Sequence, residues 1–257
     1  MGRLSGKVAI VTGAGTGLGR ATACVYAEEG ARVVVGDFRD ADGEGTVAAI
    51  RSDGGDATFV HVDVTSSAEV RALVEAAERS YGRLDIVTAN AGILGRCAGK
   101  SLVEAAEDEI DEVMAVNFGG VYLTFKHAIP AILRAGGGAM TATASLAARL
   151  GYANLDAYCA SKGAVVALVR SLSAELAPQI RVNAVSPGSM ATELGRHTME
   201  AKGQTEPQAN TRTAGMVAPR ADPRQVALAH LFLVSDEASF ISGHDLVADA
   251  GWSVIPA

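Results

Sequence analysis

Short apolar runs alternate with longer amphipathic stretches along most of the chain. The runs are rich in Val, Ile and Ala, and within them polar and apolar positions do not alternate. Such runs predict strands that are buried on both faces, which is typical of a parallel sheet. The expected strands are Val8–Val11, Arg32–Gly36, Ala57–Val62, Leu84–Ala89, Gly138–Ala144, Ile180–Val185 and Asp245–Ala248.

The stretches between these runs carry apolar residues at helical spacing. Pro223 follows Asp222, and a capping residue before a proline is typical of a helix start. The expected helices are Leu18–Glu29, Asp42–Ser52, Ser67–Tyr81, a long region from Leu102 to Leu133, Ala157–Ala177 and Pro223–Val234. The alternation predicts a single α/β domain over residues 1–257, with a doubly wound parallel sheet of about seven strands and helices on both faces.

The segment Ser189–Arg220 is the least regular part of the chain. It is polar, rich in Thr, Ala and Gly, and longer than most connections in compact domains. We therefore expect residues 189–220 to form a substrate lid or to be partly disordered.

Composition excludes several classes of protein. Apolar residues make up 49% of the chain, and the net charge of −7 argues against nucleic acid as a partner, because phosphate binding needs a basic patch. No apolar run reaches the length of about 18 residues that a membrane span requires. Cys24, Cys97 and Cys159 are scattered, and the five histidines lack metal-binding spacing. We expect a cytoplasmic protein without disulfides or a bound metal.

A glycine-rich turn directly follows the first strand. It runs from Thr12 to Gly19 and opens the first helix. Its spacing differs from GxGxxG because Leu18 occupies the last glycine position, and no Lys-Ser/Thr pair follows that would make it a P-loop. Glycines let a backbone approach a pyrophosphate closely, and the helix N-terminus adds free N–H groups. The turn predicts a dinucleotide site, and a ligand-free strand–helix turn is the alternative.

Asp37, at the end of the second strand, bears on the choice of cofactor. A carboxylate at this place accepts hydrogen bonds from an adenosine 2′-hydroxyl and repels a 2′-phosphate, which favours NAD over NADP. Arg39 is the counter-argument, because a base could hold that phosphate. We favour a solvated surface charge for Arg39, because Phe38 rather than a base directly follows the aspartate.

Tyr158 and Lys162 stand four residues apart in a predicted helix, so their side chains share one face. A free phenol has a pKa near 10, and a nearby cation lowers it. The pair therefore predicts an acid–base group, although an ordinary surface Tyr and Lys would give the same pattern.

These segments together resemble the short-chain dehydrogenase/reductase family, and the resemblance covers nearly the whole chain. Residues 12–19 look like its cofactor turn, and Asp63-Val64 looks like its adenine-contacting pair. Residues 90–92 (Asn-Ala-Gly) are similar to its Asn-Asn-Ala-Gly motif, except that Ala89 replaces the first Asn. The last such segment, residues 250–252 (Ala-Gly-Trp), replaces the more usual Asp-Gly-Gly, a departure that we expect to lie remote from the chemistry.

The resemblance implies a Rossmann-type fold and a reaction. Tyr158 would be the general acid or base in hydride transfer between NAD and a secondary alcohol or ketone, and Lys162 would lower its pKa and hold the nicotinamide ribose. Ser145, which precedes Tyr158 by 13 residues as in the family, would position the substrate oxygen. Asn117 matches the active-site Asn of the family and would hold a water of a proton relay.

The same resemblance implies two sets of binding residues. The implied cofactor residues are Gly13, Thr16, Gly17, Leu18, Gly19, Asp37, Phe38, Asp63, Val64, Asn90, Ala91, Gly92, Tyr158, Lys162, Pro187, Gly188, Met190 and Thr192. The expected substrate residues are Ile93, Leu94, Ser145, Leu146, Leu150 and Tyr152. Because the latter are mostly apolar, we expect a small hydrophobic or cyclic secondary alcohol, or its ketone.

Other functions stay open at this point. A non-catalytic NAD-binding or scaffold protein would keep the glycine turn, and a 3-oxoacyl thioester reductase would share the fold but normally pairs with NADPH, which Asp37 disfavours. A serine hydrolase would need GxSxG, whereas Ser145 has no flanking glycines. The family resemblance also implies a homotetramer.

Overall fold

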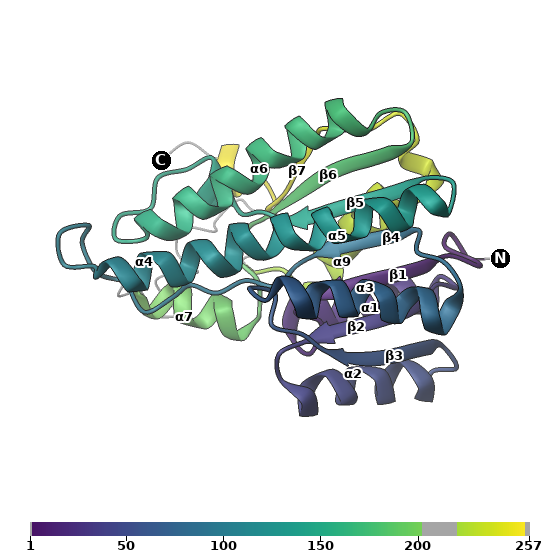
Figure 1. Ribbon diagram of the computed structural model, residues 1–257. Helices are drawn as coiled ribbons and strands as arrows, with labels where there is room; N and C mark the ends of the chain where they lie inside the picture. Colours follow the sequence, from purple (N-terminus) through teal and green to yellow (C-terminus); the bar gives the residue numbers. More distant parts are fainter. Residues whose placement is uncertain (1, 202–219, 255–257) are drawn as a thin grey trace.

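A computed structural model, which describes residues 2–201 and 220–254, contains one parallel sheet (Figure 1). Its strand order is β3-β2-β1-β4-β5-β6-β7, and all pairs are parallel. The strands are β1 (Val8–Thr12), β2 (Arg32–Asp37), β3 (Asp56–His61), β4 (Ile86–Ala89), β5 (Gly138–Thr143), β6 (Ile180–Pro187) and β7 (Asp245–Ala248). The predicted α/β class and doubly wound sheet are confirmed.

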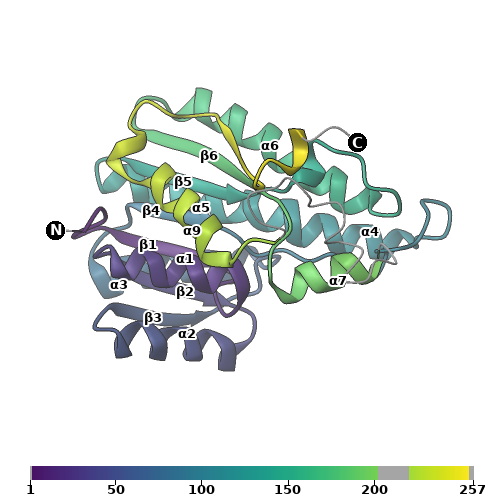
Figure 2. The same cartoon turned by 180° about the vertical axis from the view of Figure 1, so that it is seen from behind.

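Helices cover both faces of this sheet, and each face has its own apolar core. The helices are α1 (Gly17–Glu28), α2 (Asp40–Ser52), α3 (Ser67–Tyr81), α4 (Glu107–Met114), α5 (Gly120–Arg134), α6 (Asp156–Leu176), α7 (Glu193–Ala201) and α9 (Pro223–Val234). Helices α3, α5 and α6 pack on one face, and α1, α2 and α9 pack on the other (Figures 1 and 2). The central strands are buried on both sides, which explains their unbroken apolar runs.

The direction of winding reverses at β1, which pairs with β2 on one side and with β4 on the other. The crossovers therefore leave the sheet in opposite directions at this point, and a crevice opens beyond the carboxyl ends of β1 and β4. In open parallel sheets this switch point is where ligands bind.

Two predicted segments differ from the observed structure. The region from Leu102 to Leu133 is not one helix: it begins with turns, and helix starts only at Glu107, the first residue of α4. A π-helical turn (Ala115–Gly119) then separates α4 from α5. The segment 189–220, predicted to be irregular, contains α7, and its residues 202–219 lie outside the described part of the chain.

Within residues 2–201 and 220–254, no helix is long and apolar enough to cross a membrane.

Candidate active site

A cleft of about 1570 Å³ lies at the carboxyl ends of the strands. It extends from Asp37 and Phe38 at the end of β2, past the glycine turn, to Tyr158 and Lys162 on α6. Of the predicted cofactor and substrate residues, Gly19 and Leu150 do not line it, and neither does the predicted catalytic residue Asn117. The cleft brings the other predicted residues together, although they are far apart in the sequence.

Gly13 shows why the turn after β1 needs glycine. Its φ is +61°, which L side chains rarely adopt, and an added Cβ would lie 2.7 Å from Cα of Ala91. Gly19 is excluded from the cleft because it packs against the carbonyl group of Gly13. Gly19 therefore packs against the side of the turn that faces away from the cleft, and it is not positioned to contact a ligand there.

Asn90 clamps this turn from the end of β4. Its Nδ2 donates to the carbonyl oxygens of Thr12 and Gly13, at 3.1 and 3.2 Å, and its main-chain N–H donates to Thr12 Oγ1 at 3.0 Å. Thr143 Oγ1 donates to Asn90 Oδ1 at 3.0 Å. Ala89, where the family usually has Asn, is buried and faces Ala142 across the strand pair. The turn is thus held by residue 90 without help from the position that departs from the family motif.

The Asp37 carboxylate is buried and fixed from two sides. Gly15 N–H donates to its Oδ2 at 2.7 Å, and Arg39 N–H donates to its Oδ1 at 2.9 Å. Each oxygen keeps a lone pair for a further donor. The orientation of this acceptor at the end of the cleft is therefore set by the backbone before any ligand binds.

Arg39 is not the freely solvated charge that we favoured from the sequence. Its Nε lies 2.8 Å from Asp42 Oδ2, and its Nη2 donates to Thr16 Oγ1 in the glycine turn at 3.0 Å. Its Nη1 is 3.8 Å from Glu193 Oε2 at the start of α7. The guanidinium lines the cleft and joins β2, the glycine turn and α7.

Lys162 is buried beside Tyr158 in the first turns of α6. Its Nζ donates to the carbonyl oxygen of Thr143 at 2.8 Å and lies 5.8 Å from the centre of the Tyr158 ring. Burial lowers the pKa of Lys162 to about 8, because little water remains to solvate the ammonium. Lys162 therefore stays largely protonated at neutral pH but titrates far more easily than an exposed lysine.

The pKa of Tyr158 differs from the sequence-based expectation. We expected Lys162 to lower it, but burial raises it, and a hydrogen bond with Ser145 acts in the opposite direction with a smaller effect. Dehydration of the phenolate is the larger influence because Tyr158 sits in a water-poor part of the cleft. The protein alone therefore does not make this phenol an easy base.

Ser145 lies two residues after the end of β5, in extended backbone before a short 3-10 turn. Its Oγ accepts from the N–H of Ala147 at 3.1 Å, so the side chain caps this turn. The same hydroxyl interacts with the Tyr158 hydroxyl, and this interaction acts to lower the pKa of Tyr158.

Asn117 lies in the π-helical turn between α4 and α5 and is fully buried. Its Oδ1 accepts from Ile93 N–H at 2.8 Å, and its Nδ2 donates to Ile93 O at 2.9 Å and to Ser161 Oγ at 3.1 Å. A Cβ added to Gly92 would be 3.2 Å from Asn117 Oδ1 and 3.3 Å from Lys162 Nζ, so these two atoms flank one glycine.

Trp252 corrects the expectation that the last departure from the family pattern lies far from the chemistry. It lines the cleft, and its ring centroid is 6.2 Å from that of Tyr152, with the two planes 30° apart. Leu146 and Leu155 line the same end. No local pattern in the sequence indicates this contact, because it forms only after β7 has paired with β6.

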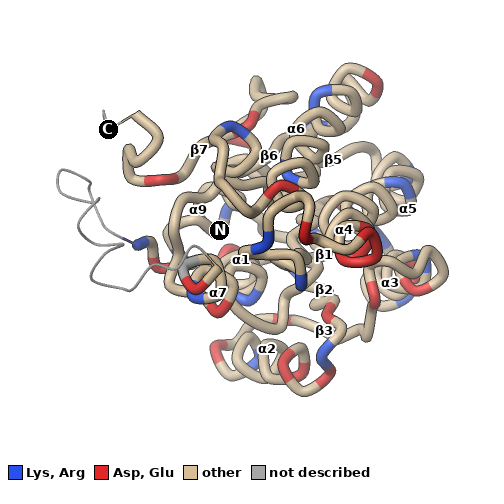
Figure 3. The backbone as a smooth tube through the Cα atoms, turned by 90° about the vertical axis from the view of Figure 1, so that its left-hand side faces the viewer, with Lys and Arg blue, Asp and Glu red and all other residues tan. Residues whose placement is uncertain are grey.

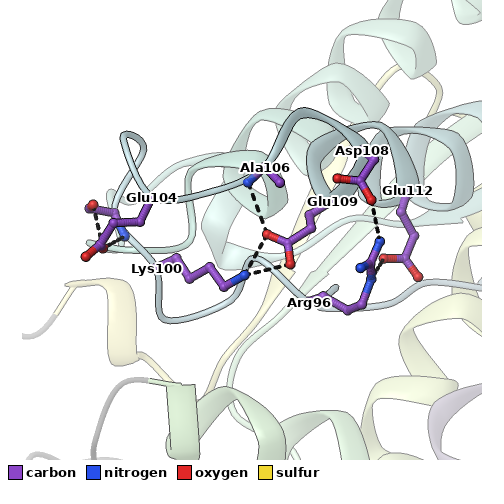
Figure 4. Close-up of polar contacts among 8 residues, drawn as sticks. Arg96, Lys100, Glu104, Ala106, Asp108, Glu109 and Glu112 are labelled. Carbon is purple, nitrogen blue, oxygen red and sulfur yellow. Dashed lines mark hydrogen bonds and ion pairs between the residues drawn. The ribbon is translucent and has the colours of Figure 1, made fainter.

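The loop that follows β4 is tied to α4 at the outer end of the cleft (Figure 4). Arg96 lies 3.0 Å from Asp108 and 3.1 Å from Glu112, and Lys100 Nζ donates to both oxygens of Glu109 at 2.6 and 2.8 Å. Acidic residues also gather along α4 and α2 on this side of the molecule (Figure 3). In these contacts at the outer end of the cleft, three carboxylates face two cations.

Comparisons with known proteins agree with this geometry. A family model named adh_short_C2, described as enoyl-(acyl carrier protein) reductase, matches residues 13–253. Secoisolariciresinol dehydrogenase of Forsythia intermedia is 38% identical over 254 residues, covering 98% of this chain and 91% of its own. 2,5-Dichloro-2,5-cyclohexadiene-1,4-diol dehydrogenase LinX of Sphingobium indicum is 36% identical over 253 residues, covering 98% of both chains.

Solved structures of dehydrogenases also resemble this chain over nearly its whole length. Carveol dehydrogenase of Mycobacterium avium, in complex with NAD, superimposes with a TM-score of 0.92 at 29% identity and covers 99% of this chain and 100% of its own. 7α-Hydroxysteroid dehydrogenase, with NADH and a 7-oxo bile acid, has a TM-score of 0.87 at 31% identity, covering 97% of this chain and 95% of its own. The chain belongs to the short-chain dehydrogenase/reductase family and is an oxidoreductase.

Proposed function

We propose that the protein is an NAD-dependent oxidoreductase that interconverts a secondary alcohol and its ketone, with Tyr158 as general acid or base. One observation carries the proposal: Tyr158, Lys162 and Ser145 open onto the same cleft as the glycine turn and Asp37. A non-catalytic NAD-binding protein would need the turn and Asp37, but it would not need Tyr158 beside a buried Lys162 at the other end of the cleft.

The residues present fit a dinucleotide. Gly13 leaves free the space that a Cβ would fill, and the turn opens α1, whose N-terminal N–H groups attract phosphate. Asp37 offers its fixed carboxylate to the adenosine ribose, and Phe38, which is 66% exposed, offers a ring face beside it. The other cofactor residues implied by the family, with the exception of Gly19, line the cleft and would complete the contacts.

Bound NAD would supply the hydride acceptor at its nicotinamide ring. In the oxidative direction Tyr158 takes the hydroxyl proton of the substrate, and in reduction it returns that proton to the carbonyl oxygen. Ser145 hydrogen-bonds the same substrate oxygen and holds it near Tyr158. Because burial raises the pKa of Tyr158, the positive charges of Lys162 and of the oxidised cofactor are needed together to favour the phenolate.

Lys162 and Asn117 would continue the proton path. The Lys162 ammonium, fixed by Thr143 O, would hold the nicotinamide ribose hydroxyls. Asn117 flanks Gly92 opposite this ammonium, where it would hold a water that passes the proton onward.

The lining favours an apolar substrate. Leu146, Leu155 and the Tyr152–Trp252 pair contribute a largely apolar lining to the cleft that Ser145 also lines. The named substrates of carveol dehydrogenase and 7α-hydroxysteroid dehydrogenase are cyclic alcohols or ketones, which fits the same expectation. Residues 189–201, the described part of the segment expected to form a lid, include α7 and line the cleft, which suits a role in covering this substrate.

A 3-oxoacyl thioester reductase is the second candidate, because the matching family model is described as enoyl-(acyl carrier protein) reductase, whose substrate is also an acyl thioester. Two features disfavour it. Thioester carriers bring phosphate groups, which the acidic outer end of the cleft repels, and Asp37 disfavours the NADPH that this reaction normally uses.

Assembly and location complete the proposal. Tyr122 and Leu133 on α5 and Leu228 on α9 are exposed apolar side chains, which suits a homotetramer that light scattering would detect. The described cysteines are free thiols, as we expect of a cytoplasmic protein.

The test is a screen in which the protein is given NAD⁺ or NADP⁺ together with cyclic and acyclic secondary alcohols. Formation of NADH or NADPH is measured by its absorbance. We expect NADH formation with at least one apolar cyclic alcohol and much slower use of NADP⁺. Faster NADP⁺ reduction, or activity restricted to thioesters, would contradict the proposal.

A further inference from the structure

Arg39 stands at the end of the cleft where the adenosine of a dinucleotide would lie. It contacts Thr16, Asp42 and Glu193, and its side chain is half exposed. The Asp42 contact is the shorter ion pair, at 2.8 Å, whereas the Glu193 contact is 3.8 Å. Two carboxylates therefore compete for one guanidinium, and neither belongs to the residue expected to bind the ribose.

The Asp42 carboxylate that holds the guanidinium lies beside the expected ribose-binding carboxylate of Asp37. A Cβ added to Gly15 would lie 2.8 Å from Asp37 Oδ2 and 2.7 Å from Asp42 Cβ, so the two aspartates flank one glycine. The main-chain N–H of Arg39 donates to Asp37 Oδ1, whereas its guanidinium contacts Asp42. A group attached to the ribose 2′-oxygen would come within reach of Arg39.

The surrounding charge is unfavourable for such a group when it is a phosphate. Asp42 and Glu193 contact the guanidinium of Arg39, and Asp37 accepts the main-chain N–H of the same residue, so these four side chains together carry two net negative charges. Asp40 lies in the same first turn of α2, but its Oδ1 is paired with His61 Nδ1 at 2.6 Å instead. Arginine binds phosphate best with two free N–H donors on one edge, and here Asp42 contacts Nε and Thr16 accepts from Nη2 of the guanidinium.

We propose that Arg39 is a latent ligand for the 2′-phosphate of NADP, and that Asp42, with Glu193, sets the preference for NAD by holding Arg39. The proposal rests on the dinucleotide site of the proposed function and goes beyond Asp37. Removing the Asp37 carboxylate alone leaves Arg39 bound to Asp42, so that change weakens NAD binding without producing a good NADP site. Release of Arg39 is the second requirement.

The experiment measures dissociation constants of NADH and NADPH by fluorescence, without substrate. All variants carry Asp37→Ser, and Asp42→Asn, Asp40→Asn or Glu193→Gln is introduced as a second substitution. Asp40→Asn is the matched control: it removes one carboxylate from the same helical turn and leaves the Arg39 contacts intact. A further variant combines Asp37→Ser, Asp42→Asn and Arg39→Ala.

We expect Asp42→Asn to tighten NADPH binding about tenfold over Asp37→Ser alone, the size of one charge contact at a half-exposed site. Asp40→Asn should change it by less than about twofold, because it leaves Arg39 engaged. Glu193→Gln should give a smaller gain than Asp42→Asn, in line with its longer contact. Arg39→Ala should remove the Asp42→Asn gain.

Equal gains in NADPH affinity from Asp40→Asn and Asp42→Asn would show that only the overall negative charge of the site matters. A gain in NADPH affinity that persists in the Arg39→Ala variant would exclude Arg39 as the ligand. Either result overturns the proposal. If Asp37→Ser variants unfold, the same comparison in the native background must still favour Asp42→Asn over Asp40→Asn. Failure of the wild-type protein to bind NADH would instead refute the proposed function.

Discussion

Lys162 donates its Nζ hydrogen bond to the main-chain carbonyl oxygen of Thr143, at 2.8 Å. The hydroxyl of the same threonine donates to Asn90, which in turn clamps the glycine turn. One residue at the end of β5 thus holds both the buried lysine of α6 and the cofactor turn of β1. Tyr158 and the glycine turn are therefore positioned relative to each other by the sheet.

Lys162→Met tests the burial of this ammonium. The folded-state pKa of Lys162 is lowered to about 8, and its unfolded value is about 10.4, so the folded protein binds fewer protons between these values. Stability of the wild type relative to Lys162→Met should therefore rise with pH above about 8, by about 1.4 kcal/mol per unit. Denaturant unfolding of both proteins at several pH values measures this, and parallel stability curves would contradict the burial.

His230 gives the corresponding prediction on the acid side. It is buried between Thr141 and Thr143, and burial lowers its pKa to about 3. Because Thr143 gives its proton to Asn90, Nε2 of His230 donates to Thr143 and Nδ1 accepts from Thr141.

The neutral imidazole must gain a proton as the protein unfolds below about pH 6.5. The amide of His230→Gln can hydrogen-bond with both threonines. Relative to this variant, the free energy of unfolding of the wild type should fall by about 1.4 kcal/mol for each pH unit of acidification. Unfolding titrations at pH 7 and lower measure the difference, and a difference that does not change with pH would mean that His230 protonates within the fold.

Gly13→Ala tests the cofactor turn. The positive φ of Gly13 and the contact of an added Cβ with Ala91 make alanine strained there, so we expect loss of NADH binding and a stability cost of about 1–3 kcal/mol. Gly45→Ala is the matched control, because Gly45 lies within α2 and an added Cβ meets nothing within 4 Å. That variant should keep NADH affinity and gain about 0.5–1 kcal/mol. Equal effects of the two changes would count against the close approach at Gly13.

Asp37→Ser tests the ribose acceptor. The change removes a fixed carboxylate whose two oxygens are aligned by Gly15 and Arg39, so NADH binding should weaken about tenfold. Fluorescence titration measures the affinity, and Asp40→Ser, a carboxylate paired with His61 outside the cleft lining, serves as the reference. An unchanged NADH affinity in Asp37→Ser would refute the ribose role.

The sheet could be predicted from the sequence because its central strands are buried on both faces and keep unbroken apolar runs. The spacing of Ser145, Tyr158 and Lys162 could be predicted for a related reason, since these residues sit on or beside regular elements. By contrast, the break before Glu107 and the π-helical turn around Asn117 leave no local signal that overrides helical periodicity.

The remaining errors concern contacts between distant segments. Trp252 reaches Tyr152 only because β7 is the edge strand beside β6, and Arg39 meets Glu193 only when α7 lies over the cleft. The pKa of Tyr158 depends on how much water the fold excludes, which no four-residue spacing reveals. Thr143, which no motif singled out, joins the two halves of the site for the same reason.

Replacing Tyr158 tests the central claim most directly. Tyr158→Phe removes one hydroxyl and keeps the ring, while Tyr152→Phe makes the same change at another tyrosine of the cleft. With the alcohol found in the screen, Tyr158→Phe should lower kcat by about 10³-fold or more with NADH affinity nearly unchanged, whereas Tyr152→Phe should keep kcat within about tenfold. Turnover by Tyr158→Phe at a rate comparable to the wild type would contradict the assignment of Tyr158 as the acid–base group.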